Sequence, residues 1–323
     1  MNQTTKKQHY VWRHYLAAWT QDNTPTGQIM CLRNNRVFPV SLMKIAHENY
    51  FYEVKELSKQ ERALVYEMLI KNTTGVQRHT NEQWLNLYCA PFDFADAITS
   101  NQFSAFEQKS WMNLRQEQAF KDWNIEYIEH LHSQIEATGI RYISLLRQND
   151  LSFWQDEEER DKFSFFLTNQ YFRTKKTRDA IISSVERCKE EMNYFPDIYP
   201  ENIWLPLSLI MASNMGVHIV QDYSAVLLQA DDASFIVGDQ PVINTHSTFD
   251  ETSIPDEVEL FYPIAPHSAL LLTRDRKYTN GQAISITCDQ VEDFNMLEQK
   301  SSREMIFAKE RTQLASFISS YES

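Results

Sequence analysis

The chain has 323 residues, with 31 Lys and Arg against 44 Asp and Glu, a formal charge of −13, and 42% hydrophobic residues. This length and composition predict a substantial core, in one large domain or two. A negative charge of this size opposes non-specific binding to nucleic acid, because it repels phosphates. The six glycines are widely spaced, which excludes a dinucleotide-binding fingerprint, a Walker A loop and a GxSxG elbow.

The cysteines and the N-terminal segment indicate the cellular compartment in which the protein is expected. Because the four cysteines lie far apart in the sequence, they cannot form a CxxC-type metal knuckle, and we expect reduced thiols. The opening residues lack the apolar stretch of a secretory signal, and no apolar run approaches the ~18 residues of a membrane span. We therefore expect a cytoplasmic protein that does not enter a membrane.

The first part of the chain predicts a short helix and several strands. His9 and Arg13 lie four positions apart in an aromatic segment, which suits a helix. Residues 27–32 and 37–40 flank Asn34 and Asn35, and this pattern predicts a β-hairpin because Asn tolerates the positive φ of tight turns. Residues 50–54 predict a further strand.

From residue 58 to about residue 213 the pattern is mostly helical. Ser58 and Glu61 have the spacing of a capping box, which predicts a helix start. The longest amphipathic pattern, 155–192, predicts one long helix with apolar side chains on one face. We expect helix breaks near four residues: Gly75, Pro91, Gly139 and Pro196.

Beyond residue 222 the pattern changes to short β-runs. Residues 225–228 and 235–237 flank a polar segment, which predicts a second hairpin. Further strands are expected at three places: 260–264, 269–273 and 283–287. The end of the chain, from residue 289, is helical again, with a second capping-box spacing at Ser301 and Glu304.

Together these elements predict an α+β fold. A mixed or antiparallel sheet would be built from N- and C-terminal segments, with a large helical insertion between them. The sheet-containing part would comprise residues 1–57 and 220–323, and the helical part residues 58–219, in one compact unit.

Five phrases in chain order resemble an uncharacterised prokaryotic family of unknown function, DUF4238. Members open with a phrase like HYVPQFYLKNF and continue with phrases like I..EN.Y, Q..RT, FI.SD.PV and PLSP…LLL. The matching segments here are residues 9–19, 45–52, 170–174, 235–242 and 262–272. The resemblance implies a fold but no established activity.

Two positions depart from the family pattern. Trp12 stands where the family usually has Pro, so the turn into the chain is expected to differ. Gly238 stands where the family usually has Ser or Thr, so a hydroxyl role at that position is lost.

A polar interruption in the apolar face of the 155–192 helix is the main candidate site. Gln170, Thr174 and Arg178 follow one another at four-residue spacing. A buried amide or guanidinium left unpaired costs on the order of 1–3 kcal/mol or more, so these groups need partners. They form either a hydrogen-bonded core network or the lining of a cleft that faces the sheet.

The same segment, 173–178, carries four cationic side chains in six positions. Such a run predicts a site for an anionic or phosphorylated ligand, since Arg offers a bidentate fork. The alternative is a solvated helix face paired with nearby acids, which we prefer for Lys175 and Lys176.

Three further residues are candidates for acid–base chemistry. His9 suits general acid–base catalysis near neutral pH, although a His among aromatics is more often a packed residue. Glu48 is a candidate base or metal ligand, or a partner of Arg13. Asp239 follows an apolar strand, where either a functional carboxylate or a local Asx-turn is expected.

Two function classes follow. The first is a hydrolase of a phosphate ester or nucleic acid, of the kind found in defence or toxin systems. His9, Glu48 and Asp239 would be catalytic, with Arg13, Gln170, Arg173 and Arg178 holding the substrate. The metal requirement is left open, with Mg²⁺ as the candidate. The second is a non-catalytic module that binds or senses an anionic ligand or a protein partner. A plain scaffold is a third option.

Overall fold

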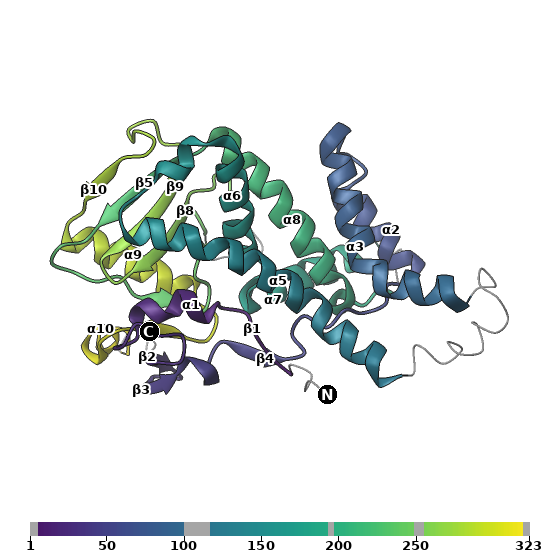
Figure 1. Ribbon diagram of the computed structural model, residues 1–323, viewed down its shortest axis with the longest axis horizontal. Coiled ribbons are helices and arrows are strands. Elements are labelled where there is room, and N and C mark those ends of the chain that lie inside the picture. The colour runs from purple at the N-terminus through teal and green to yellow at the C-terminus, as the bar shows by residue number, and fades with distance from the viewer. Residues whose placement is uncertain (1–5, 100–116, 193–196, 249–254, 319–323) are drawn as a thin grey trace. The chain divides into compact units, whose positions relative to one another are not determined.

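A computed structural model describes residues 6–99, 117–192, 197–248 and 255–318 (Figure 1). Its α-helices are α1 (Arg13–Leu16), α2 (Lys59–Leu69), α3 (Gly75–Thr99), α5 (Gln118–Arg147), α6 (Glu157–Phe172), α7 (Lys175–Met192), α8 (Pro200–Asp222), α9 (Cys288–Ser301) and α10 (Arg311–Ala315). The 3₁₀ helices are η1 (Ala17–Trp19), η2 (Leu42–Lys44) and η4 (Ser152–Gln155). The strands are β1 (Lys7–His9), β2 (Gln28–Arg33), β3 (Arg36–Ser41), β4 (His47–Asn49), β5 (Ser224–Gln229), β6 (Val237–Gly238), β7 (Ile243–Asn244), β8 (Leu260–Ala265), β9 (Ser268–Thr273), β10 (Ala283–Ser285) and β11 (Ile306–Ala308).

The α+β prediction is confirmed. Strand order is β3-β2-β11-β6 in a four-stranded sheet, β10-β5-β9-β8-β7 in a five-stranded sheet, and β1-β4 in a two-stranded sheet. The four-stranded sheet joins N-terminal and C-terminal strands, because β11 pairs antiparallel with β2. The five-stranded sheet is mixed, since β10 runs parallel to β5 while the other neighbours are antiparallel.

The predicted first hairpin is confirmed, and the strand predicted after it is wrong. β2 and β3 pair antiparallel, and Asn34 and Asn35 take positive φ values of 51° and 57° at the turn. The predicted strand at 50–54 is absent from the described structure, where β4 ends at Asn49. Tyr50, with φ of 58°, turns the chain at this point.

The hairpin predicted around residues 231–234 is also wrong. β5 pairs with β9 and β10, whereas β6 belongs to the four-stranded sheet and pairs with β11. The two apolar runs therefore enter different sheets. Their local patterns are those of buried strands, and only the long-range pairings decide their neighbours.

The capping box at Ser58 and Glu61 is confirmed as the start of α2. By contrast, α3 continues through Pro91 and α5 through Gly139. Pro91 deprives the Leu87 carbonyl of its helical donor, and the Tyr127 hydroxyl donates to this carbonyl at 3.1 Å. Gly75 begins α3 with a positive φ of 56°, and Pro196 lies outside the described residues.

The single helix predicted at 155–192 is two helices, α6 and α7. Arg173 follows α6 with φ −86° and ψ 5°, and the Thr174 hydroxyl accepts from the Thr177 main-chain N–H. Both residue types are compatible with a helix interior, so the break comes from contacts that these side chains make with distant segments. The polar stripe through Gln170, Thr174 and Arg178 therefore lies on two elements.

The helix predicted from residue 289 is confirmed as α9, which begins at Cys288, but the second capping box predicted within it is not. Its capping box is formed by Thr287 and Gln290. Ser301 is the last residue of α9, and the segment through Glu304 leads into β11, so the predicted capping box there is wrong.

The described chain divides into two compact units. Unit 1 comprises Met1–Gln8, Glu48–Gln134 and Arg178–Asn214, and unit 2 comprises His9–His47, Ile135–Thr177 and Met215–Ser323. Residues 135–177 group with the two larger sheets in unit 2, and the division into a sheet-containing part and a helical part stays a prediction. The unit boundaries fall inside α5, α7 and α8.

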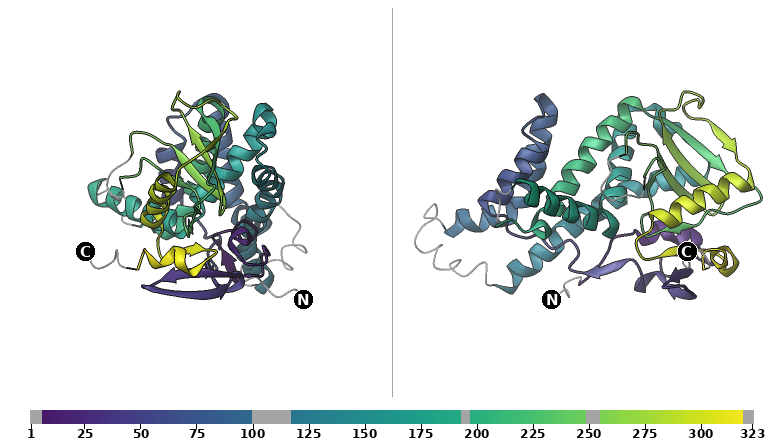
Figure 2. Two further views of the ribbon diagram at one scale, coloured as in Figure 1. Left: turned by 90° about the vertical axis from the view of Figure 1, so that its left-hand side faces the viewer. Right: turned by 180° about the vertical axis from the view of Figure 1, so that it is seen from behind.

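In unit 2, α9 covers one face of the five-stranded sheet. Phe294 of α9 stacks on Phe261 of β8, with ring centroids 4.3 Å apart. Val291 and Leu297 join the same apolar cluster. Figure 2 shows this yellow helix lying along the strands in the view from behind. On β8, Tyr262 stacks on Tyr15 of α1 at 4.8 Å.

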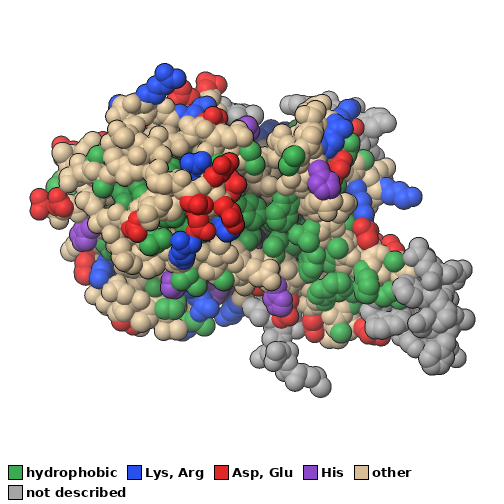
Figure 3. All heavy atoms as spheres, turned by 45° about the horizontal axis from the view of Figure 1, so that its top comes forward, with side chains coloured by type: hydrophobic (Ala, Val, Ile, Leu, Met, Phe, Trp, Pro, Cys, Tyr) green, Lys and Arg blue, Asp and Glu red, His purple; other side chains and the backbone are tan. Residues whose placement is uncertain are grey.

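In unit 1, the helices pack around aromatic side chains and one buried carboxylate. Phe51 packs on Trp204 with centroids 5.3 Å apart. Glu61, only 2% exposed, accepts from the Asn202 amide at 2.9 Å. Some apolar side chains of α3 and α5 remain exposed, and Figure 3 shows a face on which hydrophobic side chains lie beside mixed charges.

Helix α8 bears on the prediction that no segment could enter a membrane. Its 23 residues are long and apolar enough to cross a bilayer by length and composition alone, with a mean hydropathy of 1.5 in the most apolar window. However, 61% of that window is buried inside the protein, as in a core helix.

Candidate functional site

Asp239 lies directly after β6 and is almost fully buried, with 1% exposure. Its carboxylate accepts hydrogen bonds from the main-chain N–H groups of Arg303 at 2.7 Å and Glu304 at 2.9 Å. Burial raises the pKa of Asp239 to about 6, even though these hydrogen bonds oppose the shift. Asp239 therefore fixes the segment that connects α9 to β11.

That segment lines a pocket beside the turn of the first hairpin, which we call the hairpin pocket. Its volume is about 420 Å³. Its lining residues are Leu32, Arg33, Asn34, Asn35, Gln299, Ser302, Arg303, Glu304, Met305 and Ile306.

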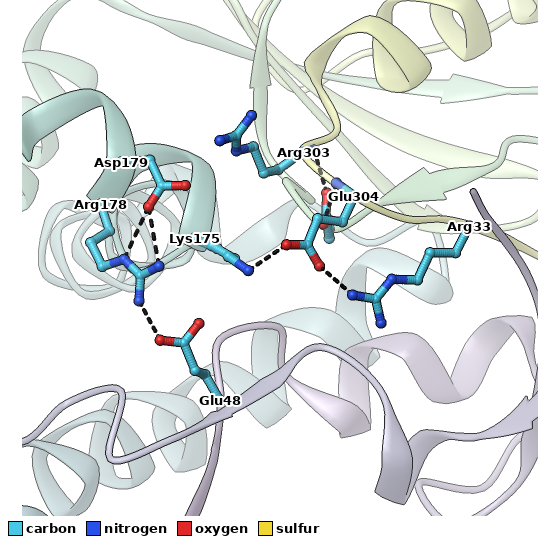
Figure 4. A network of polar contacts seen from close by, with 8 residues as sticks. Arg33, Glu48, Lys175, Arg178, Asp179, Arg303 and Glu304 are labelled. Atoms are coloured by element: carbon cyan, nitrogen blue, oxygen red, sulfur yellow. Dashed lines mark hydrogen bonds and ion pairs between the residues drawn. The ribbon is translucent and has the colours of Figure 1, made fainter. Parts of the chain in front are cut away.

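Two cationic side chains bind one carboxylate of the hairpin pocket. The Glu304 carboxylate accepts from Arg33 Nη2 at 2.8 Å through one oxygen and from Lys175 Nζ through the other. Figure 4 draws this row of contacts, with Arg303 reaching away from the Glu304 carboxylate. Arg33 and Arg303 both line the pocket, so its positive side chains outnumber its single Glu.

A second buried carboxylate lies behind this segment. Glu298 on α9 is fully buried, and its Oε2 accepts from the main-chain N–H of Gly238 at 2.9 Å. Burial raises the pKa of Glu298 well above its usual range, nearby Asp239 adds to this, and Lys176 opposes it.

The glycine at position 238 is explained by its neighbour. A Cβ added there would lie 2.0 Å from the Ser302 hydroxyl oxygen and 3.3 Å from Glu298 Oε2. Ser302 itself donates to the Glu298 carbonyl at 2.7 Å. Position 238 thus has no room for a Cβ, and the Ser302 hydroxyl occupies the space beside it.

His9 and Arg173 form another polar group in unit 2. Arg173, 3% exposed, donates to the His9 main-chain carbonyl at 2.7 Å and pairs with Glu136. The His9 ring packs edge-on against that of His47, with centroids 5.3 Å apart. Burial lowers the pKa of His9 to about 4, with Arg13 and His47 adding to the effect. His9 is therefore neutral at pH 7.

The remaining predicted residues of unit 2 have identified surroundings. Gln170 is 2% exposed, and within the described part of the chain its Nε2 has no hydrogen-bond partner. Thr174 bonds through its hydroxyl to the Gln240 side chain, and Gln240 donates to the carbonyls of Tyr171 and Val242. Arg13 contacts the sulfur of Met43.

Glu48 and Arg178 belong to unit 1 and pair with each other. Arg178 Nη1 lies 2.7 Å from Glu48 Oε1, and Nη2 lies 3.1 Å from Asp179 (Figure 4). The guanidinium also lies over the Phe51 ring, 4.8 Å from its centroid. Two carboxylates thus share this cation, and Glu48 pairs with Arg178 as well as lining a pocket of about 270 Å³.

The structure therefore brings some predicted residues together and assigns others different partners. Arg173 meets His9, and Arg178 meets Glu48, whereas the carboxylate of Asp239 is bound by main-chain N–H groups. The pairing of Arg33 with Glu304 could not be predicted from the sequence, because 271 positions separate the two residues and no local pattern marks the contact. Across the described residues, no group of three or more His, Cys, Asp or Glu could hold a metal ion.

Contacts between distant segments connect the five family-like phrases. Tyr10 donates its main-chain N–H to Ala46, which links the first phrase to the second. The Arg173–His9 contact links the third to the first, and the Thr174–Gln240 contact links the third to the fourth. The stacked pair Tyr15 and Tyr262 links the first to the last. The phrases thus specify one set of packed contacts.

These features define an α+β protein whose five family-like phrases are connected by contacts within unit 2. The family model described as "Protein of unknown function (DUF4238)" matches residues 7–312, and the chain belongs to this family. Neither the curated proteins nor the solved structures contain a match to the chain.

Proposed function

We propose that this protein binds an anionic ligand, one that carries a phosphate group, in the hairpin pocket. The observation that carries the proposal is that Arg33 and Arg303 line the pocket while its single carboxylate, Glu304, pairs with Arg33 and Lys175, on a chain with a net charge of −13. In so acidic a protein a local excess of positive charge is a site of attraction for an anion.

The ligand would replace Glu304 as the partner of these cations. The Arg33 side chain is 47% exposed, Glu304 is 27% exposed and Lys175 is 23% exposed. An exposed ion pair contributes only about 0–1 kcal/mol, so little free energy opposes the exchange of the carboxylate at Arg33, the more exposed of the two cations. A phosphate offers more acceptor oxygens than a carboxylate, and Arg33 can bind two of them at once.

Asp239 would act as a positioning residue in this proposal. By accepting from the N–H groups of Arg303 and Glu304, it fixes the pocket segment from inside the protein. This arrangement fixes the main chain that carries Arg303 and Glu304 before the ligand arrives, which reduces the entropy lost on binding.

Isothermal titration with inorganic phosphate and with a nucleoside monophosphate tests the proposal. We expect saturable binding that weakens about tenfold or more in Arg33→Ala, because a charge-assisted hydrogen bond is lost. Lys277→Ala is the matched control: it removes one cation whose exposed pair with Asp275 lies outside the pocket. Absence of binding, or equal affinity in Arg33→Ala and the parent, would reject the proposal.

A second candidate is hydrolysis of a phosphate ester at the same pocket. It is favoured by Asp239 and Glu298, two buried carboxyls behind the pocket segment whose pKa values are raised. A carboxyl with a pKa of about 6 can exchange a proton near neutral pH. Assays with phosphate monoesters, RNA and DNA, with and without Mg²⁺, test this candidate. Turnover lost in a folded Asp239→Asn protein supports it, and binding without turnover leaves only the binding function.

A further inference from the structure

A second pocket in unit 2 has a different lining and a simpler charge pattern. Its volume is about 290 Å³, and we call it the Arg147 pocket. Its lining residues are Ala18, Asn23, Arg147, Ala265, Pro266, His267 and Lys309. None of these residues lines the hairpin pocket.

The charges of the Arg147 pocket all have one sign. Arg147, Lys309 and His267 are its titratable lining residues, and its lining includes no Asp or Glu. The hairpin pocket differs in this respect, since Glu304 neutralises part of its charge. An acidic chain that leaves a hollow lined only by cationic and neutral side chains creates a local field that favours an anion.

Arg147 is half-buried, and its contacts leave its charge uncompensated. Its Nε donates to the Ile264 carbonyl at 3.1 Å and its Nη2 to the Tyr15 carbonyl at 3.0 Å. Both acceptors are neutral, and no carboxylate pairs with Arg147 among the described residues. Burial accordingly lowers the pKa of this guanidinium. Burying a cation without a counter-ion is costly, so an anion in the pocket would recover part of that cost.

The other two side chains have polar groups available to a ligand. His267 Nδ1 lies 2.9 Å from the Ala233 carbonyl, which can only accept, so Nδ1 carries the proton and the ring orientation is fixed. Nε2 is the remaining ring nitrogen of this exposed side chain; it accepts a hydrogen bond in the neutral ring and donates one to a ligand oxygen in the protonated ring. Lys309 makes no ion pair within the described chain, and its side chain is half-buried at the pocket.

We propose that the Arg147 pocket binds the phosphate group of a small phosphate monoester. Arg147, His267 and Lys309 would contact the oxygens of the tetrahedral group from the end of α5, the β8–β9 turn and the end of β11. The Asn23 side chain adds a neutral donor or acceptor for the rest of the molecule. The pocket volume of about 290 Å³ favours a small ligand, because it lies just below the range of about 300–1,000 Å³ that is usual for small-molecule sites.

Titration calorimetry with inorganic phosphate and glycerol 3-phosphate, with glycerol as the uncharged comparison, tests this site in the full chain. We expect affinity for glycerol 3-phosphate to fall about tenfold in Lys309→Ala and to be restored in Lys309→Arg, since one charge-assisted contact is lost and regained. Lys277→Ala, which removes a cation outside this pocket, should bind as the parent does.

The variants also separate this site from the hairpin pocket. Phosphate binding that is lost in Lys309→Ala and retained in Arg33→Ala takes place in the Arg147 pocket. Binding that is lost in Arg33→Ala and retained in Lys309→Ala takes place in the hairpin pocket. His267→Ala, checked for folding by its thermal unfolding midpoint, should match Lys309→Ala. Equal affinity for glycerol 3-phosphate in the parent, Lys309→Ala and His267→Ala would overturn the inference, as would an affinity for glycerol equal to that for its phosphate.

Discussion

The buried guanidinium of Arg173 donates a hydrogen bond of 2.7 Å to the main-chain carbonyl of His9, a residue 164 positions earlier in the chain. The same guanidinium pairs with Glu136 on α5. A side chain at the end of α6 thus ties the opening segment to a second helix. This contact explains why the helix predicted from 155 to 192 is interrupted where it is.

Replacing Arg173 by Ala should therefore destabilise the protein strongly. Removing one partner of a buried ion pair leaves the other charge uncompensated, which costs about 3–5 kcal/mol. Arg141→Ala is a suitable control, since Arg141 is 62% exposed and also pairs with a glutamate, Glu159. Its expected cost is below about 1 kcal/mol. Urea unfolding measures both free energies, and similar small losses in the two variants would contradict this role of Arg173.

Asp239 should make the protein less stable as the pH rises from about 4 to about 6. Its pKa is raised to about 6 in the folded protein, so in this window the folded state holds a proton that the unfolded state has released. The stability contributed by this proton is complete below about pH 4 and is lost as the pH passes the folded-state pKa. Relative to Asp239→Asn, the wild type should lose roughly 2–3 kcal/mol of unfolding free energy between pH 4 and pH 7.

The comparison with Asp239→Asn isolates this one carboxyl from other titrating groups. Urea unfolding of both proteins at a series of pH values gives the difference in free energy directly. A difference that stays constant across the series would show that Asp239 does not titrate in this window.

His9 should have the opposite pH dependence. Its pKa is lowered to about 4, so between about pH 4 and pH 6.5 the unfolded state binds a proton that the folded state does not. The stability due to neutral His9 is present above about pH 6.5 and is lost as the pH falls towards 4. An NMR titration of the His9 ring, assigned with His9→Gln, should give a midpoint near 4, and a midpoint near 6.5 would contradict its burial.

Gly238→Ala should destabilise the contact between β6 and the end of α9. The new methyl would lie 2.0 Å from the Ser302 hydroxyl oxygen, and such overpacking costs roughly 1–3 kcal/mol. Adding Ser302→Ala should recover part of this loss by removing the nearest atom. Gly216→Ala is the control, because its Cβ would meet its nearest neighbours at an ordinary 3.5 Å. If thermal unfolding shows equal midpoints for Gly238→Ala and Gly216→Ala, the close packing at position 238 is refuted.

Features decided by neighbouring residues were predictable from the sequence. The Asn34–Asn35 turn and the Ser58–Glu61 cap depend on backbone conformation and on contacts within a few positions, and both were predicted correctly. The family-like phrases indicated which distant segments matter. The phrases did not indicate which side chains of these segments contact one another.

Features decided by long-range contacts were missed. Pro91 suggested a helix break, but a hydroxyl from α5 satisfies the carbonyl that it leaves free. Arg173 and Thr174 suggested a helix interior, but their side chains bond to Glu136 and Gln240. Glu304 suggested a helix cap and Arg33 suggested no role, because the pocket that they line exists only after β11 pairs with β2.

The most direct test of anion binding is a crystal soaked with tungstate, a tetrahedral oxyanion whose metal gives an anomalous signal. We expect an anomalous peak in the hairpin pocket, within hydrogen-bond distance of the Arg33 guanidinium. The Glu304 carboxylate should no longer contact that guanidinium. A hairpin pocket without a peak, in a crystal whose Glu304 still binds Arg33 and Lys175, would contradict the proposed function.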